Sequence, residues 1–247
     1  MPKILGINFF DGTVEQAIDV ISERGGFLIA PSGTCFARLR RDEAYRVAVA
    51  NADLAIPDSG ALVLLWRFLR GGKLNRISGW KYLRTLSAKF FQEKQTQVLW
   101  VVASERAREM TMRWLDRNAF SYVSSDFYVA PIYAAAVSDP DLLAKIDKTK
   151  PRHIVVGIGS GPQEKLGYYL RENLSYRPAI HCIGAALGFL TGEQVAIPEW
   201  ADRFYLGWLL RLVSQPRIFL PRLMRAIELP VLLLRYGENL PPLKNKS

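Results

Sequence analysis

Short apolar runs alternate with amphipathic helical patterns along most of the chain, and this alternation constrains the fold more than any other feature. Glycine, proline or polar turn residues bound each run. The predicted strands are 3–9, 26–30, 54–56, 97–102, 122–124, 153–158 and 180–183. The predicted helices are 13–23, 35–50, 60–69, 80–92, 106–118, 139–148 and 163–174. This order predicts an α/β fold, a Rossmann-like and mostly parallel sheet with helices on both faces.

A carboxylate, Asp58, lies between the apolar run 54–56 and the helical pattern that starts at Gly60. Parallel sheets bind ligands outside the carboxyl ends of their strands, so we expect Asp58 on that rim. As a catalytic base it would work best with its pKa raised by partial burial. Aspartate is also a favoured N-cap, and the alternative is that Asp58 only caps the following helix.

A glycine-rich loop follows the run that begins at His153, in the segment HIVVGIGSGPQEK. Glycines let the backbone approach a phosphate, and the following helix N-terminus offers free N–H groups to an anion. A nicotinamide site would need an acid at the end of the next strand, but 180–183 leads into Gly184-Ala-Ala-Leu-Gly188. The loop therefore predicts a phosphate site without a nicotinamide cofactor; the alternative is a glycine turn with no ligand.

The net charge of +10 suits nucleic acid, an anionic membrane surface or a phosphate-bearing substrate.

Two cysteines and two histidines provide neither a disulfide framework nor a histidine-rich metal site, and we expect both histidines in the core or at strand edges. Asp139 and Asp141 open a predicted helix, which favours a cap over a metal site. No signal-peptide pattern and no apolar run of membrane-spanning length are visible, so we expect a cytoplasmic protein.

The segment after Trp200 has a different character, because arginines interleave with aromatic and aliphatic residues and strand patterns disappear. We predict an α/β domain at 1–198, a basic amphipathic helical appendage at 199–240 and a tail at 241–247, with fraying from Glu238 onward. The concentration of charge in an apolar helical segment favours an anionic membrane surface over nucleic acid. The alternative is an ordinary packed helical tail.

Several motifs in order resemble the WecG/TagA/CpsF glycosyltransferase family. They run from residue 4 to residue 217 and are ILGINFFDGTVEQAID, Asp58, NRISG at 75–79, VGIGSGPQE at 156–164, IGAALGFLTG at 183–192, Gly207-Trp208 and RLVSQPR at 211–217. The resemblance implies an inverting, metal-independent hexosyltransferase without a cofactor. It would move a sugar, typically N-acetylmannosamine, from a UDP-sugar to a lipid-diphosphate-linked acceptor during surface polysaccharide synthesis.

The resemblance also implies roles for individual residues. Asp58 matches the proposed general base, and Arg211 and Arg217 match the arginines that act on the diphosphate or acceptor. The positions matched to nucleotide-sugar binding are Ser32, Arg76, Gly159, Ser160, Gly161, Gln163, Glu164 and Gly184. For Arg76 the alternative is a solvated surface arginine. We expect the protein on the inner face of the cell membrane, bound peripherally, and leave a homo-oligomer open.

Departures from the family pattern motivate a second hypothesis. Ala30 replaces a threonine and Ser32 an asparagine of the family's Thr-x-Asn motif, and Lys81 and Gly188 stand where the family has aspartates. A catalytically silent relative that binds a nucleotide sugar or an assembly partner is therefore the alternative to an active transferase.

Overall fold

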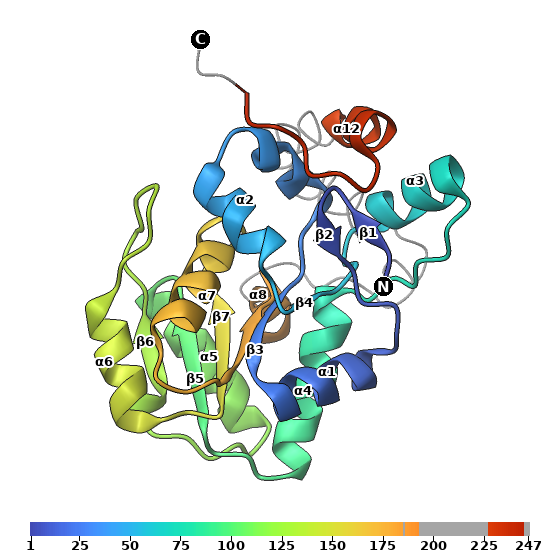
Figure 1. Ribbon diagram of the computed structural model, residues 1–247. Coiled ribbons are helices and arrows are strands. Elements are labelled where there is room, and N and C mark those ends of the chain that lie inside the picture. The colour runs from blue at the N-terminus through green and yellow to red at the C-terminus, as the bar shows by residue number, and fades with distance from the viewer. Residues whose placement is uncertain (185, 193–226, 245–247) are drawn as a thin grey trace.

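The computed structural model describes residues 1–184, 186–192 and 227–244. Its centre is a six-stranded parallel sheet in the order β4-β3-β8-β7-β5-β6. The strands are β3 (Gly26–Ile29), β4 (Leu54–Ala55), β5 (Val98–Val102), β6 (Phe127–Val129), β7 (His153–Gly157) and β8 (Ala179–Cys182). Figure 1 shows helices on both sides of this sheet, and the predicted Rossmann-like α/β class is confirmed.

Alternate side chains along each strand enter two separate hydrophobic clusters, as expected where successive residues point to opposite faces. In β5, Leu99 and Val101 join one cluster while Trp100 and Val102 join the other. Because both faces are covered, the central strands are apolar except for His153 and His181, which is why they were visible as nearly continuous runs in the sequence.

Each cluster is closed by its own set of helices. One face carries α2 (Glu43–Ala50), α6 (Pro140–Thr149) and α7 (Pro162–Asn173). The opposite face carries α1 (Val14–Arg24), α4 (Gly79–Gln92), α5 (Glu105–Arg117) and α8 (Ala186–Thr191). Side chains that precede these helices satisfy their first N–H groups: Thr13 accepts from Gln16, and Asp139 accepts from Leu142 as predicted.

Three predicted elements are wrong in detail. Segment 3–9 is a hairpin of β1 (Lys3–Ile4) and β2 (Ile7–Asn8), because Leu5 and Gly6 turn the chain with positive φ angles. Segment 35–50 splits into a 3-10 helix, η1 (Gly33–Arg40), and α2, since Asp42 caps a new helix. Segment 122–124 is not a strand; a short 3-10 turn, η2 (Ser124–Asp126), precedes β6 instead.

The end of the chain packs onto the α/β body. Helix α12 (Glu228–Tyr236) lies against η1 and α3 (Gly60–Arg70), and its Leu229, Leu232 and Leu233 are buried in the cluster that contains α2 and α7. The expected fraying from Glu238 is wrong as far as Lys244. The Gly6 N–H donates to the Glu238 carbonyl at 2.9 Å, and the Lys244 N–H donates to the Arg40 carbonyl at 2.8 Å.

The division between residues 198 and 199 lies outside the described ranges and stays a prediction. Within those ranges, every helix is too short or too polar to cross a bilayer.

Candidate active site

The candidate site lies at the carboxyl ends of β4, β3, β8 and β7, four neighbouring strands. Strand β4 pairs on the outer side of β3 at one edge of the sheet, and β6 pairs on the outer side of β5 at the other edge. Strands β7 and β8, which come last in the sequence, lie between these two pairs. A reversal of this kind opens a crevice above the strand ends, which is where ligands bind in doubly wound sheets. The sequence placed Asp58 and the glycine loop on this rim, and the structure places both there.

Asp58 follows β4, and its carboxylate contacts the start of α4. Its Oδ1 accepts a hydrogen bond from the Gly79 backbone N–H at 2.8 Å, and its own carbonyl accepts from the Arg76 Nε at 2.9 Å. The cap of the following helix α3 is Ser59, whose Oγ accepts from the Leu62 N–H at 3.2 Å. The reading of Asp58 as the cap of that helix is therefore wrong.

Gly79 lies where three strand ends converge. A Cβ on Gly79 would lie 3.4 Å from the Ile183 carbonyl oxygen, 3.7 Å from the Ala30 Cβ and 3.8 Å from the Asp58 Oδ1. The loops after β8, β3 and β4 therefore meet around the Asp58 carboxylate. Arg76 belongs to the same corner through its bond to Asp58, which places it beside the predicted base.

The glycine loop turns sharply between β7 and α7. Gly159 has φ +89° and Gly161 has φ +103°, conformations that side chains other than glycine rarely adopt. Several backbone N–H groups of this segment cannot bind an anion. The Gly161 N–H donates to Glu164 at 2.6 Å, and the Gln163 N–H donates to the Gly159 carbonyl at 3.3 Å. Pro162 has no N–H. The N–H groups of Gly159 and Ser160 donate to no other residue in the described part of the chain.

Glu164 and Gln163 are fully buried beneath this loop. The Glu164 carboxylate accepts from the Gly161 N–H, and from the Ser160 hydroxyl and the Gln163 amide at 3.2 Å each. Gln163 in turn accepts from the Gly184 N–H at 2.9 Å, which ties the end of β8 to the loop. Burial raises the pKa of the Glu164 carboxyl, against hydrogen bonds that act to lower it. Both side chains hold the loop in shape; a direct contact with a nucleotide stays a prediction.

Ser32 is joined to the glycine loop through a residue that the sequence motifs did not indicate. Ser32 Oγ lies 3.0 Å from the Cys35 Sγ, which lies 2.7 Å from the Ser160 Oγ. Burial raises the pKa of the Cys35 thiol, so it remains protonated near neutral pH. Since the Ser160 hydroxyl donates to Glu164, the consistent arrangement has Cys35 donating to Ser160. The η1 segment is thereby fixed to the loop after β7.

Arg38 is a second residue that the sequence motifs missed. It lies on η1 with its guanidinium directly against Gly161, where a Cβ would be 2.8 Å from its Nη1. The only sequence signal was a cluster of basic residues after the second strand, which surface charge explains equally well. Arg211 and Arg217 lie outside the described residues, so their predicted roles remain predictions.

The buried histidines lie away from this rim. His153 Nδ1 is 3.2 Å from the His181 Nε2, and the His181 Nδ1 is 2.9 Å from the Tyr82 hydroxyl, so the expectation of core histidines is confirmed. Burial lowers the pKa of His153 to about 4, helped by the charges of Arg152 and Lys89. Within 1–184, 186–192 and 227–244, no three His, Cys, Asp or Glu side chains are grouped to hold a metal ion.

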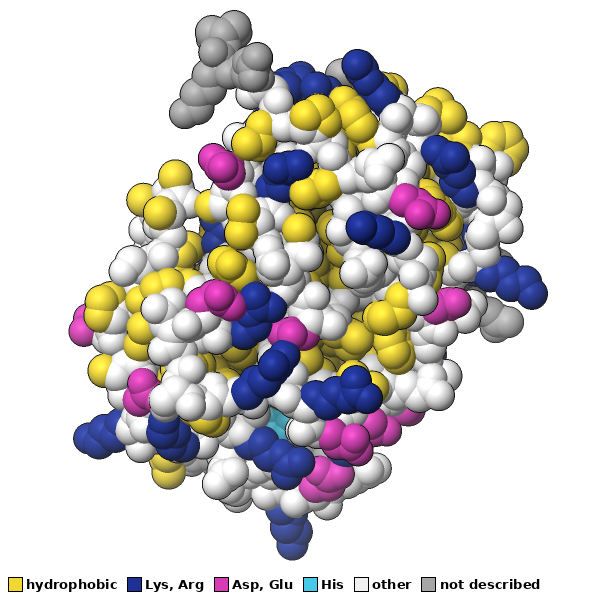
Figure 2. Space-filling view, viewed as in Figure 1, with side chains coloured by type: hydrophobic (Ala, Val, Ile, Leu, Met, Phe, Trp, Pro, Cys, Tyr) yellow, Lys and Arg dark blue, Asp and Glu magenta, His cyan; other side chains and the backbone are white. Residues whose placement is uncertain are grey.

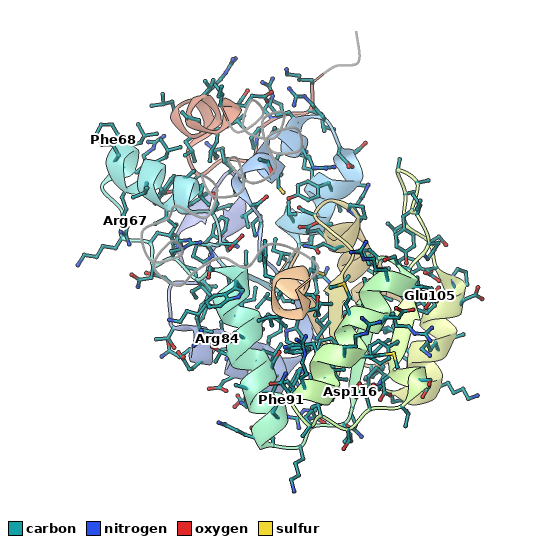
Figure 3. All side chains as sticks on the ribbon, turned by 180° about the vertical axis from the view of Figure 1, so that it is seen from behind. Arg67, Phe68, Arg84, Phe91, Glu105 and Asp116 are labelled. Atoms are coloured by element: carbon teal, nitrogen blue, oxygen red, sulfur yellow. The ribbon has the colours of Figure 1, made fainter. Side chains whose placement is uncertain are left out.

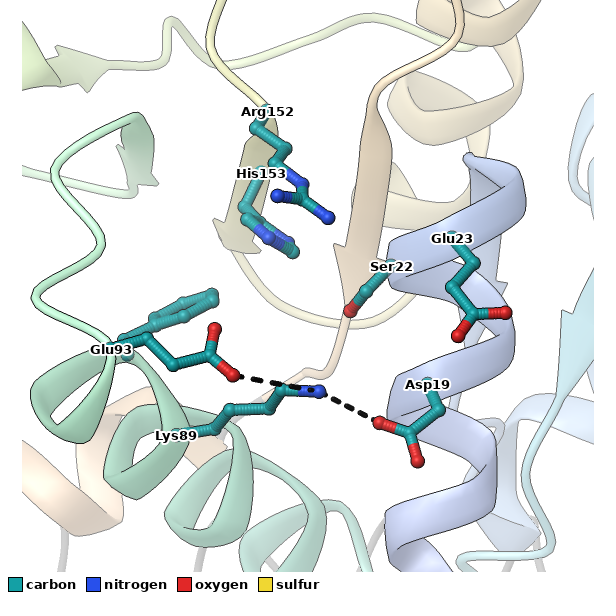
Figure 4. Close-up of a pocket in the computed structure, with 8 residues that line it drawn as sticks. Asp19, Ser22, Glu23, Lys89, Glu93, Arg152 and His153 are labelled. Carbon is teal, nitrogen blue, oxygen red and sulfur yellow. Dashed lines mark hydrogen bonds and ion pairs between the residues drawn. The ribbon is translucent and has the colours of Figure 1, made fainter.

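A cavity of about 290 Å³ lies at the amino ends of the strands, beside His153. Figure 4 shows Lys89 reaching across it between Asp19, at 2.7 Å, and Glu93, at 3.9 Å. Lys89 is therefore paired with two of the acids that line the cavity. This cavity is at the end of the sheet opposite to Asp58 and the glycine loop.

Comparison with known proteins agrees with the motifs on the rim. The family described as "Glycosyl transferase WecG/TagA/CpsF family" matches residues 2–244. A relative from Bacillus spizizenii (strain W23), the N-acetylglucosaminyldiphosphoundecaprenol N-acetyl-beta-D-mannosaminyltransferase, is 22% identical over 197 residues, which cover 78% of this chain and 73% of the relative. Because the family match extends over nearly the whole chain, the chain belongs to the WecG/TagA/CpsF family of glycosyl transferases.

Proposed function

We propose that this protein transfers a sugar, of the N-acetylmannosamine type, from a UDP-sugar to a lipid-diphosphate-linked acceptor during surface polysaccharide synthesis, with inversion at the sugar. Membership of the family supports glycosyl transfer. The name of the Bacillus spizizenii relative supports the sugar and the acceptor class. The observation that carries the proposal is the placement of Asp58 and the glycine loop on one rim of the sheet.

In the proposed reaction, the Asp58 carboxylate takes the proton of the acceptor hydroxyl. The hydroxyl oxygen attacks the anomeric carbon of the donor from the face opposite to the diphosphate. The bond between that carbon and the diphosphate oxygen breaks, and its electron pair leaves with UDP. General-base assistance of this kind contributes about 10²–10⁴-fold to rate.

Backbone N–H groups and guanidinium groups supply the charge stabilisation in this proposal. The N–H groups of Gly159 and Ser160 face no internal acceptor among the described residues and suit phosphate oxygens. Guanidinium pairs with phosphate oxygens in a bidentate way, so arginines can stabilise the departing diphosphate without a metal. The Gly79 N–H holds one oxygen of the Asp58 carboxylate, which fixes the direction of the base.

A surface on α3 and α12 supports peripheral attachment to a membrane. Leu64 and Phe68 on α3, and Val231 and Leu234 on α12, are exposed; Phe68 is 87% exposed. Basic residues on the same two helices or next to them are Arg67, Arg70, Lys73 and Arg235. Figure 2 shows hydrophobic and basic side chains interleaved where Figure 1 places these helices, and Figure 3 shows Arg67 and Phe68 projecting from the end of α3. We call these eight residues the α3–α12 surface.

Apolar side chains flanked by Lys and Arg suit the interface of an anionic bilayer. A lipid-linked acceptor is met at the bilayer, and we therefore propose that the protein works at the inner face of the cell membrane. The α3–α12 surface would contribute to this attachment together with the arginine-rich segment 203–225.

The catalytically silent relative remains the second candidate, because of one observation beside Asp58. Ala30 lies against Gly79, the residue whose N–H binds the proposed base, so a methyl group is present in this corner where the family pattern has a threonine hydroxyl. If that hydroxyl were needed to orient a substrate, the chain would bind a donor without transferring its sugar.

The test is a thermal-shift screen of UDP-sugars, followed by turnover with the best ligand and a prenyl-diphosphate-linked N-acetylglucosamine acceptor. The proposal predicts stabilisation by UDP-N-acetylmannosamine or a related UDP-sugar, and release of UDP that depends on the acceptor. Binding without acceptor-dependent release supports the silent relative. A chain that binds no UDP-sugar contradicts the transferase and leaves, of the silent relative, only the form that binds an assembly partner.

A further inference from the structure

Helix η1 runs along the rim from the Asp58 corner to the glycine loop. Its first residue, Gly33, lies beside Ser59, since a Cβ there would be 2.9 Å from the Ser59 Oγ. Further along, Cys35 contacts Ser160 at 2.7 Å, and Arg38 lies against Gly161. From Gly33 to Arg38 a 3-10 helix rises about 10 Å. Arg38 therefore stands at the glycine-loop end of the same rim of the sheet, with Asp58 near the other end of η1.

Among the described residues, Arg38 has no charge partner, unlike its neighbours Arg41 and Lys165. Arg41 forms an ion pair with Glu228, Lys165 pairs with Asp42 at 3.3 Å, and Arg40 lies over the Tyr236 ring at 5.8 Å. In the part of the chain that the structure describes, the Arg38 guanidinium makes neither a hydrogen bond nor an ion pair. The side chain is nevertheless partly buried, and a guanidinium carries five donors that favour planar, bidentate acceptors.

The glycine loop lacks positive charge of its own. Its nearest acid, Glu164, is fully buried and already accepts hydrogen bonds from Gly161, Ser160 and Gln163. It is therefore not positioned as a partner for Arg38. The Arg38 guanidinium lies against Gly161, and the uncommitted donors of the same loop are the N–H groups of Gly159 and Ser160. A guanidinium against a loop that also offers two backbone donors suits a phosphate group, because charge-assisted and neutral hydrogen bonds can then be made to one anion.

We propose that Arg38 binds the diphosphate of the sugar-nucleotide donor and neutralises the charge that develops on it as the sugar leaves. This inference rests on the proposed function and adds to it a residue of η1. Helix η1 follows β3, whereas the glycine loop follows β7. Arg38 touches the substrate in this proposal, whereas Cys35 and Glu164 act only by positioning the loops on either side.

The experiment compares the binding of UDP and uridine by the full-length protein, using isothermal titration for UDP and ligand-observed NMR for uridine. The variants are Arg38→Ala, Arg38→Lys and the matched control Arg41→Ala. Arg41 directly follows η1, and its substitution breaks an exposed ion pair with Glu228. We expect Arg38→Ala to weaken UDP binding about 10- to 100-fold, the range for a charge-assisted hydrogen-bonded contact. Uridine binding should be unchanged, because it lacks phosphate.

The lysine variant should retain part of the UDP affinity, since it keeps the charge and loses the planar fork. The Arg41→Ala variant should bind UDP as the wild type does. Unchanged UDP binding by Arg38→Ala overturns the inference alone. Equal losses of UDP and uridine binding also overturn it, because they indicate a structural role. Failure of the wild-type protein to bind UDP contradicts the proposed function itself.

Discussion

The backbone N–H of Gly79 donates a hydrogen bond of 2.8 Å to the Oδ1 of Asp58, across 21 residues of sequence. This bond joins the loop after β4 to the N-terminus of α4. It also sets the direction of the carboxylate, since Gly79 is packed against the end of β8 through Ile183. The proposed base is therefore held by the backbone of another segment of the rim, and its position does not depend on its own turn alone.

Replacing Glu164 should destabilise the protein through the glycine loop. In Glu164→Ala, buried donors on Gly161, Ser160 and Gln163 lose their acceptor and a cavity forms. We expect the free energy of unfolding to fall by about 2–4 kcal/mol. Urea unfolding followed by circular dichroism measures it. The control Glu109→Ala removes an exposed partner of Arg113 and should change stability by less than about 0.5 kcal/mol. Equal effects of the two substitutions would show that the buried network contributes nothing.

The buried histidines predict a loss of stability in acid. The pKa of His153 is about 4 in the folded protein and 6.5 in the unfolded chain, so the unfolded state binds its proton first as the pH falls. The contribution of His153 to the free energy of unfolding is therefore fully present above pH 6.5. It falls by about 3 kcal/mol as the pH falls from 6.5 toward 4. His181 acts in the same direction, because burial and His153 lower its pKa further.

The comparison is between urea unfolding of the wild type and of His153→Gln at several pH values from 7.5 to 4. Because glutamine does not titrate, the variant should lose less stability over this range than the wild type. Parallel stability curves for the two proteins would contradict the assignment of the acid sensitivity to His153.

Phe68→Ser should weaken attachment to anionic membranes. The side chain is 87% exposed on the α3–α12 surface, and burial of a phenylalanine in an apolar environment contributes about 1.5–3 kcal/mol. We expect co-sedimentation with vesicles of phosphatidylglycerol to fall at least about tenfold in affinity. Ile132→Ser is the matched control, since Ile132 is also fully exposed but lies in the loop between β6 and α6. If both variants bind equally well, the α3–α12 surface is not the membrane contact.

The central strands were predictable because they are buried on both faces, and the rim position of Asp58 followed from the strand before it. The break at Asp42 was missed, because the apolar pattern on either side of it is continuous and a local cap decides where α2 begins. The segment 122–124 was misjudged because Tyr122 and Val123 favour strands, whereas pairing with β5 selects Phe127–Val129.

The connections within the site could not be predicted in the same way. Cys35 and Ser160 are 125 residues apart in the sequence. They are in contact only because η1 runs from the end of β3 to the loop that follows β7. Gln163 and Glu164 were expected to face a ligand, but their burial depends on how closely the glycine loop approaches β8. Arg38 was missed for the same reason, since its neighbour Gly161 is distant in sequence.

The turnover rate of Asp58→Asn, with UDP binding measured on the same protein, tests the central claim most directly. Asparagine keeps an oxygen for the Gly79 N–H but cannot accept a proton at neutral pH, so the fold and the donor site should persist. The account predicts wild-type affinity for UDP and a fall in kcat of about 10²–10⁴-fold. Asp19→Asn, at the opposite end of the sheet, should leave kcat unchanged. An Asp58→Asn variant that transfers sugar at the wild-type rate would contradict the account.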